Sequence, residues 1–247
     1  MTPKFVEDFY IKKKNKFMRN FDERLTEVKK ELRKNFSEKK SEELLSQMRE
    51  EFENILPHIP YIGGQKNPTT LVLVKCMCDL PVFRVLEKIG FSFSEIGEFH
   101  YNYTMRIHAI RKKDLEKTGR DPSLYPFDPV YVDYQKKLTE ETQKKLYPDD
   151  WVMDFVEGDG KDFEWGWDIY ECGVQKAYKK VGGEQYLPLI CLGDFYEAEG
   201  LGFGFTRTET LGFGAEKCTH RFTRTAKTPK AWPPFDLKEF NSDYWDK

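Results

Sequence analysis

Three cysteines in the last part of the chain, Cys172, Cys191 and Cys218, are close in sequence to residues that can act together with a thiol. Cys191 and Asp194 are three residues apart, so they share a face if their segment is helical. Cys218 and His220 are two residues apart, so they share a face if theirs is a strand. A nearby cation favours the thiolate, which is the nucleophilic form of cysteine. The spacing therefore predicts cysteine-centred chemistry on one shared surface.

Two further readings of these residues stay open. Free cysteines are among the most buried residues, so each thiol alone can be a core residue. Zinc accepts sulfur and nitrogen ligands in a tetrahedron, which would use Cys172, Cys191, Cys218 and His220. The chain has no CxxC pair and no HExxH motif, so we expect no cofactor.

Arg207 is the second cation available to Cys218, and Asp194 is suited to bind an amidinium group or to orient water.

The elements that must hold these residues begin where the apolar pattern changes at Trp151. From there apolar residues alternate along the chain, which is typical of strands. The order of predicted elements is two strands, two helices and two strands, over residues 151–157, 163–170, 173–181, 185–199, 201–209 and 216–224. We therefore predict an α+β fold, with a helical N-terminal half and a four-stranded antiparallel sheet whose helices pack on one face.

The N-terminal half repeats apolar residues at helical spacing. Helices are predicted over residues 17–36, 44–55, 68–89, 94–115 and 130–146. Pro81 is expected to break the third of these, and Asn67 is expected to cap its start. The Gly63-Gly64 turn before it can expose backbone N–H groups to an anion, or it can be an ordinary helix entry.

These patterns predict three segments that form one cooperative unit: an amphipathic helical region at 1–56, an α+β domain at 57–228 and an irregular arm at 229–247. The N-terminal helices are candidates for a homodimer contact. A small molecule is the expected partner, because 40 basic and 42 acidic residues leave a charge of −2 that attracts neither nucleic acid nor an anionic membrane. The longest aliphatic run has four residues, at 71–74, which is far short of the roughly 18 apolar residues that a membrane helix needs. An odd number of cysteines in a chain without an export signal indicates a cytoplasmic protein.

The C-terminal residues resemble those of the L-2-amino-thiazoline-4-carboxylic acid hydrolase family. The similarity lies in Cys172, in the Cys-x-x-Asp of Cys191 and Asp194, and in the segment 207–222 with its Arg-Thr-x-Thr-Leu and later Cys218. A weaker similarity is the Gly-Gly-x-x-Asn loop at 63–67, so the resemblance spans about residues 55–225. Thr219 and His220 follow the last cysteine, where an acidic and an aromatic residue are common in the family.

The resemblance implies a hydrolase that opens a small cyclic amidine at a C–N bond. Cys218, as nucleophile, Asp194 and His220 are then the expected catalytic residues. Residues expected to bind the substrate are Arg207, Thr208, Cys172, Cys191, Gly63, Gly64 and Asn67, with Arg207 or the Gly63-Gly64 loop receiving a carboxylate. The alternative is a non-catalytic module that binds a small molecule or a metal in the same aromatic and cysteine-lined pocket.

Overall fold

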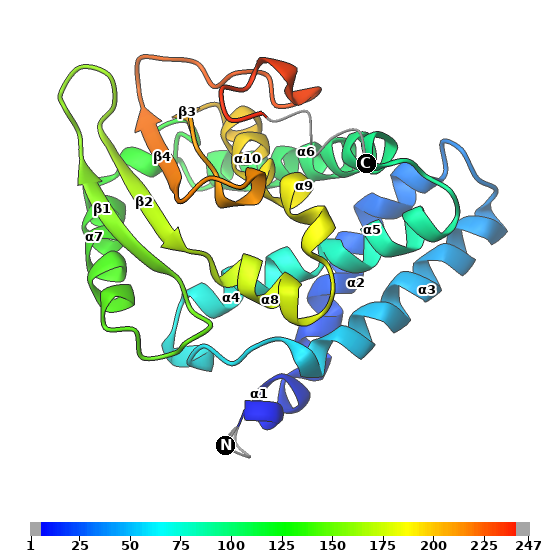
Figure 1. Ribbon diagram of the computed structural model, residues 1–247. Coiled ribbons are helices and arrows are strands. Elements are labelled where there is room, and N and C mark those ends of the chain that lie inside the picture. Colours follow the sequence, from blue (N-terminus) through cyan, green and yellow to red (C-terminus); the bar gives the residue numbers. More distant parts are fainter. Residues whose placement is uncertain (1–5, 241–247) are drawn as a thin grey trace. The chain divides into compact units, whose positions relative to one another are not determined.

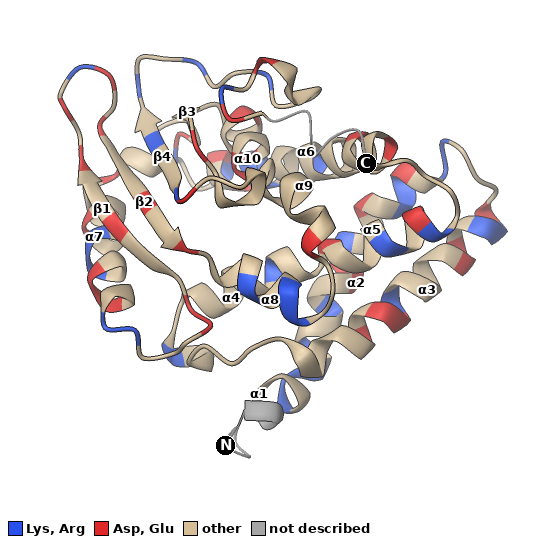
Figure 2. Ribbon diagram, in the orientation of Figure 1, with Lys and Arg blue, Asp and Glu red and all other residues tan. Residues whose placement is uncertain are grey.

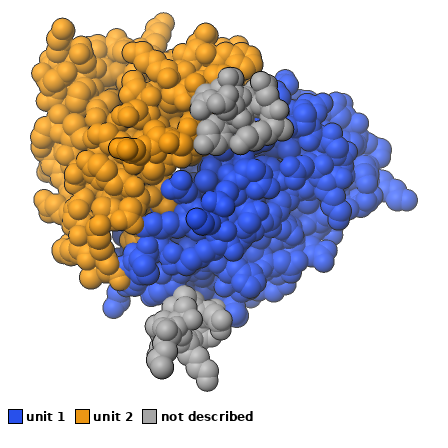
Figure 3. Space-filling view, viewed as in Figure 1, with its two compact units in different colours: residues 1–103, 147–149, 173–190 blue, residues 104–146, 150–172, 191–247 orange. Residues whose placement is uncertain are grey.

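The computed structural model describes residues 6–240, with side chains from residue 9 onward. The parts of the expected helical region and arm at 1–5 and 241–247 lie outside the described residues. The chain divides into two compact units, each assembled from separate stretches of sequence (Figure 3). Unit 1 comprises 1–103, 147–149 and 173–190, and unit 2 comprises 104–146, 150–172 and 191–247. The expected division at 1–56, 57–228 and 229–247 stays a prediction.

Unit 1 is built from helices, and its N-terminal helices follow the predicted apolar spacing. Ser37 caps one of them, because its side chain accepts a hydrogen bond from the Lys40 N–H at 3.3 Å. The helix predicted over 68–89 is broken near Pro81, as expected, since Pro81 lies in the first turn of a second helix. The helices are α1 (Val6–Lys12), α2 (Lys14–Leu32), α3 (Glu38–Ile55), α4 (Thr69–Met77), α5 (Asp79–Lys88) and α8 (Gly173–Lys180) (Figure 1).

Unit 2 contains the predicted four-stranded antiparallel sheet, so the α+β fold class is confirmed. Its strands are β1 (Val152–Glu157), β2 (Trp165–Glu171), β3 (Gly204–Thr206) and β4 (Cys218–Thr223), and their spatial order is β1-β2-β4-β3. Helix α7 (Pro129–Gln143) packs on β1, and α10 (Gly193–Leu201) packs on β3. Helix α6 (Phe93–Lys117) contributes residues to both units.

Two predicted elements of this region have different bounds in the structure. The helix expected over 185–199 is divided into a 3-10 turn at Glu184–Tyr186, α9 (Leu187–Cys191) and α10, with Leu192 between the two α-helices. The strand expected over 201–209 is shorter, because Leu201 still belongs to α10 and Gly202 ends that helix with a φ of +89°. Arg207 therefore follows β3 instead of lying within it.

Aromatic rings from neighbouring strands cover one face of the sheet. Trp165 of β2 stacks on Phe222 of β4 with ring centres 4.2 Å apart, and Trp167 contacts Phe222 edge to face at 5.3 Å. Gly166 lies between the two tryptophans, where a Cβ atom would be 2.2 Å from the carbonyl oxygen of His220. Only glycine allows β2 and β4 to approach this closely, so Gly166 sets the relative positions of Trp167 and His220.

Charged residues of both signs occur along the surface helices, as Figure 2 shows for α3. Many form ion pairs, such as Lys29 with Glu38 at 2.8 Å and Lys40 with Glu43 at 2.7 Å. Within residues 6–240, no helix is both long enough and apolar enough to cross a membrane.

Candidate active site

An aromatic cavity of about 70 Å³ lies in unit 2. Three polar residues, Asp194, Glu197 and His220, interrupt the aromatic lining. The remaining lining residues are Tyr125, Pro126, Tyr131, Trp167, Phe203, Phe205 and Phe222.

The two carboxylates of the cavity come from the same face of α10, since Asp194 and Glu197 are three residues apart. Glu197 is paired with Arg111 of α6, so its charge is balanced inside unit 2. Asp194 exposes 46% of its side chain although it also accepts a hydrogen bond from Arg207 Nη1 at 2.6 Å. Asp194 is therefore the more accessible carboxylate for a bound molecule.

Arg207 is buried and directs all five of its N–H groups to protein acceptors. Its Nη1 donates to Asp194 Oδ2 at 2.6 Å and lies 3.0 Å from His220 Nε2. Its Nη2 donates to the Cys191 carbonyl oxygen and to Glu239 Oε1, both at 2.7 Å. Its Nε donates to Glu239 Oε2. A substrate carboxylate would have to displace one of these partners. The geometry thus gives Arg207 the role of holding Asp194 and His220 instead of the expected role of binding a carboxylate.

His220 lies on β4 and lines the cavity, and its Nε2 is 3.6 Å from Asp194 Oδ2. Burial lowers the pKa of His220 well below its usual value, and the Arg207 and Arg221 cations lower it further. The imidazole is therefore neutral at physiological pH. Because the guanidinium of Arg207 can only donate, Nε2 accepts, and the ring proton is assigned to Nδ1.

The cysteines predicted to carry the chemistry are near this network but outside the cavity lining. Cys218 is 5% exposed, and its sulfur accepts a hydrogen bond from the Leu211 N–H at 3.3 Å. Burial raises the pKa of the Cys218 thiol although Arg207 acts against that rise. Burial also raises the pKa of Cys191, well above its usual value. Both thiols are thus in the protonated, weakly nucleophilic form.

Other predicted substrate-binding residues lie elsewhere. Thr208 is exposed and bonds to Thr219 of β4, with 3.0 Å between the hydroxyl oxygens, and Cys172 follows the end of β2. Gly63, Gly64 and Asn67 belong to unit 1.

The loop at 63–67 has a structural explanation of its own. Gly63 and Gly64 have φ angles of +109° and +59°, which favour glycine. Asn67 donates from its side chain to the Ile62 carbonyl oxygen at 2.5 Å and accepts from the Thr69 N–H at 3.1 Å, whereas the N-cap of α4 is Pro68, one residue later than predicted. The backbone conformation thus explains why glycine and asparagine occupy these three positions.

Sequence reasoning missed several residues of the site. Glu197 had a visible signal, its three-residue spacing from Asp194 on one helix. Trp167 lies in the strand predicted over 163–170, but the alternation does not mark it as part of a site. Glu239, which forms two hydrogen bonds with Arg207, lies in the Pro-rich arm, where neither periodicity nor a motif indicates it. Among the described side chains, no group of three or more His, Cys, Asp and Glu residues could hold a metal ion.

Comparison with protein families places part of the chain in a known family. Residues 75–222 match the family described as L-2-amino-thiazoline-4-carboxylic acid hydrolase. The match contains Asp194, Arg207, Cys218 and His220 but begins after the loop at 63–67. Comparisons with curated proteins and with solved structures gave no match.

Proposed function

The chain belongs to the L-2-amino-thiazoline-4-carboxylic acid hydrolase family, a name that implies a hydrolase, and we propose that its unit 2 cavity opens the ring of this cyclic amidine or of a close analogue. The proposal rests on one observation above all. A small aromatic cavity presents the half-exposed carboxylate of Asp194 to whatever it binds. This combination suits a planar cation, because aromatic faces and a carboxylate both attract positive charge.

The protonated 2-amino-thiazoline ring is such a cation. Its ring and exocyclic nitrogens form an amidinium group, which can donate hydrogen bonds to Asp194 while Trp167 and Phe205 contact the ring. Glu197 adds little net charge, because Arg111 balances it. The cavity volume of about 70 Å³ favours a small ring over a larger ligand.

The substrate also carries a carboxylate, and Trp167 supplies the best group to receive it. The Trp167 Nε1–H is buried and has no hydrogen-bond partner among the described residues, although it belongs to a residue of the cavity lining. A buried donor without an acceptor is unfavourable, so an acceptor on the ligand would stabilise the complex. This role replaces the one expected for Arg207.

The reaction can be written with Asp194 as the proton carrier. Asp194 takes a proton from water as the water oxygen bonds to the ring carbon between nitrogen and sulfur. The tetrahedral carbon, which now carries a hydroxyl, then expels the ring nitrogen, which receives the proton from Asp194, so the C–N bond breaks. As the C=O bond forms, the hydroxyl proton passes through Asp194 to the freed amine, which gives an ammonium group and a carbamoyl thioester-type group. The neutral Nδ1–H of His220 can donate to the oxygen that gains charge. Arg207 keeps both groups in place.

A turnover assay with L-2-amino-thiazoline-4-carboxylate tests this proposal, with mass spectrometry of the product and separate detection of amine, thiol and ammonia. Ring opening at the C–N bond gives a new primary amine and no thiol. A free thiol would instead assign the cleavage to the C–S bond, and free ammonia without ring opening would contradict the proposed reaction.

Asp194→Asn is the decisive variant, with an expected loss in kcat of roughly 10²-fold or more, because the amide cannot accept the proton. Asp133→Asn is the matched control, since Asp133 is an exposed carboxylate on α7 outside the cavity. Equal activity in the two variants would remove Asp194 from the mechanism.

A further inference from the structure

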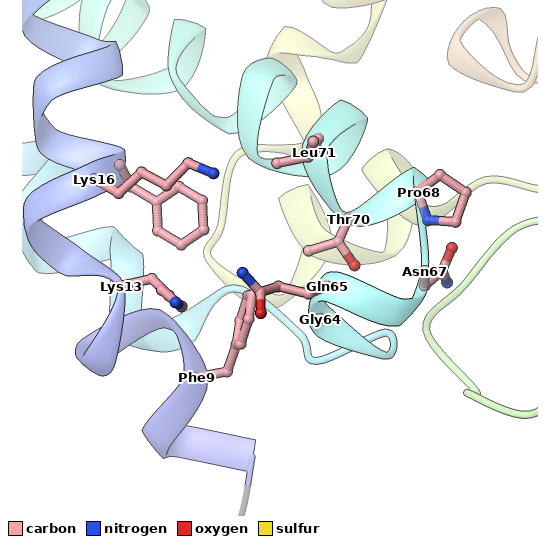
Figure 4. Close-up of a pocket in the computed structure, with 10 residues that line it drawn as sticks. Phe9, Lys13, Lys16, Gly64, Gln65, Asn67, Pro68, Thr70 and Leu71 are labelled. Carbon is pink, nitrogen blue, oxygen red and sulfur yellow. The ribbon is translucent and has the colours of Figure 1, made fainter.

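A second and larger cavity, of about 250 Å³, lies entirely within unit 1 (Figure 4). It shares no residue with the unit 2 cavity, and all of its lining precedes residue 75, where the family match begins. The lining residues are Phe9, Lys13, Lys16, Phe17, Gly64, Gln65, Asn67, Pro68, Thr70 and Leu71. The cavity therefore lies outside the matched residues 75–222, although Gly64 and Asn67 belong to the loop that resembles the family.

Two lysines place positive charge at the cavity. Lys13 lies between α1 and α2, and Lys16 lies in the first turn of α2, from which its side chain extends toward α4 in Figure 4. Neither ammonium group has an ion pair or a hydrogen bond among the described residues, whereas the intervening Lys14 pairs with Glu53 of α3. Two unpaired cations beside one cavity favour an anionic occupant.

An unsatisfied hydroxyl in the cavity lining independently indicates a ligand. Thr70 is 1% exposed, and within the described part of the chain its Oγ1 has no hydrogen-bond partner. The adjacent Thr69 differs, because its hydroxyl donates to Asn67 Oδ1 at 2.7 Å. A ligand oxygen would give the Thr70 hydroxyl the acceptor that the protein does not provide.

The rest of the lining is mostly apolar. The rings of Phe9 and Phe17 form one part, with 6.0 Å between their centres, and Leu71 of α4 forms another. Leu71 is 58% exposed, so its apolar side chain is accessible at the cavity. These walls suit a ligand with an apolar body attached to its charged group.

We propose that unit 1 carries a binding site for a small organic carboxylate, which is separate from the hydrolase site. Lys13 and Lys16 bind the carboxylate, the Thr70 hydroxyl donates to one of its oxygens, and Phe9, Phe17 and Leu71 contact the apolar body. The proposal does not depend on the reaction in unit 2.

Benzoate is a suitable probe, with benzamide as its neutral counterpart of the same shape. Calorimetric titration of the full chain at roughly millimolar ligand should show saturable binding of benzoate, weaker binding of benzamide, and a loss of benzoate affinity as salt is added. The double variant Lys13→Ala/Lys16→Ala should weaken benzoate at least about tenfold and leave benzamide almost unchanged. The charge-matched control is Lys39→Ala/Lys88→Ala, which removes two exposed cations of unit 1 away from the cavity.

Thr70→Val keeps the shape of the side chain and removes only the hydroxyl, so it should weaken benzoate by roughly threefold. Absence of saturable benzoate binding to the unaltered protein would overturn the proposal, as would equal weakening by the control pair. Turnover of the cyclic amidine is measured on the same variants. An increase in its KM in Lys13→Ala/Lys16→Ala would show that the cavity serves the hydrolase substrate, which also contradicts a separate site.

Discussion

At the scale of single residues, Arg207 determines how the polar groups of the cavity are presented. Its buried guanidinium holds Asp194, His220 and Glu239 together, and its charge helps to keep His220 neutral. Asp194 remains half exposed in spite of this contact. The arrangement leaves one accessible carboxylate in an aromatic cavity and a neutral imidazole beside it.

Cys218 gives the clearest choice between two mechanisms. If water attacks with the help of Asp194, Cys218→Ser should keep turnover within about threefold of the unaltered enzyme, because the residue is outside the cavity and its thiol is protonated. If Cys218 is the nucleophile, as its spacing from His220 led us to expect, the loss should reach orders of magnitude. Steady-state kinetics separates the two, and a circular dichroism spectrum confirms that the variant is folded.

Trp167 is predicted to act on substrate binding. Trp167→Phe keeps an aromatic wall and removes the Nε1–H, so we expect KM for the carboxylate-bearing substrate to rise about tenfold with little change in kcat. The neutral analogue 2-amino-thiazoline, which lacks the carboxylate, serves as the control and should be affected much less. An equal rise in KM for both compounds would indicate that the indole ring of Trp167, and not its Nε1–H, determines substrate binding.

At the scale of elements, the close approach of β2 and β4 positions the cavity. Gly166→Ala would place a Cβ atom against the His220 carbonyl oxygen and displace Trp167 or His220, so both thermal stability and turnover should fall. Gly193→Ala is the control, since nothing lies within 4 Å of a Cβ atom at the first residue of α10, and it should be neutral or stabilising by up to about 1 kcal/mol. Thermal unfolding of both variants, with kinetics at a low temperature, checks this prediction.

The elements were largely predictable from periodicity, and the site was predictable only in part. The alternation that begins at Trp151 indicated the strands, and the helix predicted over 185–199 is present in two parts, with Cys191 at the end of α9 and Asp194 in α10. Sequence spacing could not show that Leu192 separates two helices or that Cys218 is buried, because both depend on tertiary packing. Glu239 was unpredictable for the same reason, as its role arises only when the arm returns to Arg207.

At the scale of the whole molecule, each unit contains a buried titratable residue whose pKa is lowered. In unit 2 this residue is His220. In unit 1 it is Asp79, at the start of α5, which accepts hydrogen bonds from Arg24 and Tyr103. Burial acts to raise the pKa of Asp79, but the Arg24 cation and then His100 act against it, and the net shift is downward. The two units should therefore respond to acid at different pH values.

The sign of each response follows from proton binding. In the unfolded chain His220 binds a proton as the pH falls below its usual pKa of 6.5, while the folded protein leaves it neutral, so the stability of unit 2 should begin to decrease there. Asp79 in the unfolded chain binds a proton only near its usual pKa of 3.8, so its contribution to unit 1 should persist to that pH and be lost as the pH falls further. His220→Gln should flatten the pH dependence just below 6.5, and Asp79→Asn should flatten it below about 4.

Tryptophan fluorescence makes the two responses separable, because unit 1 contains no tryptophan and the four described tryptophans belong to unit 2. Urea unfolding followed by fluorescence should show how His220→Gln changes the pH dependence of the stability of unit 2. Circular dichroism at 222 nm should in addition show how Asp79→Asn changes that of unit 1. At neutral pH Asp79→Asn should already destabilise the protein by roughly 3–5 kcal/mol, because it leaves the buried Arg24 cation without its carboxylate. An unchanged slope just below pH 6.5 in His220→Gln would mean that His220 is not held neutral, and the proposed tautomer with its proton on Nδ1 would then have to be abandoned.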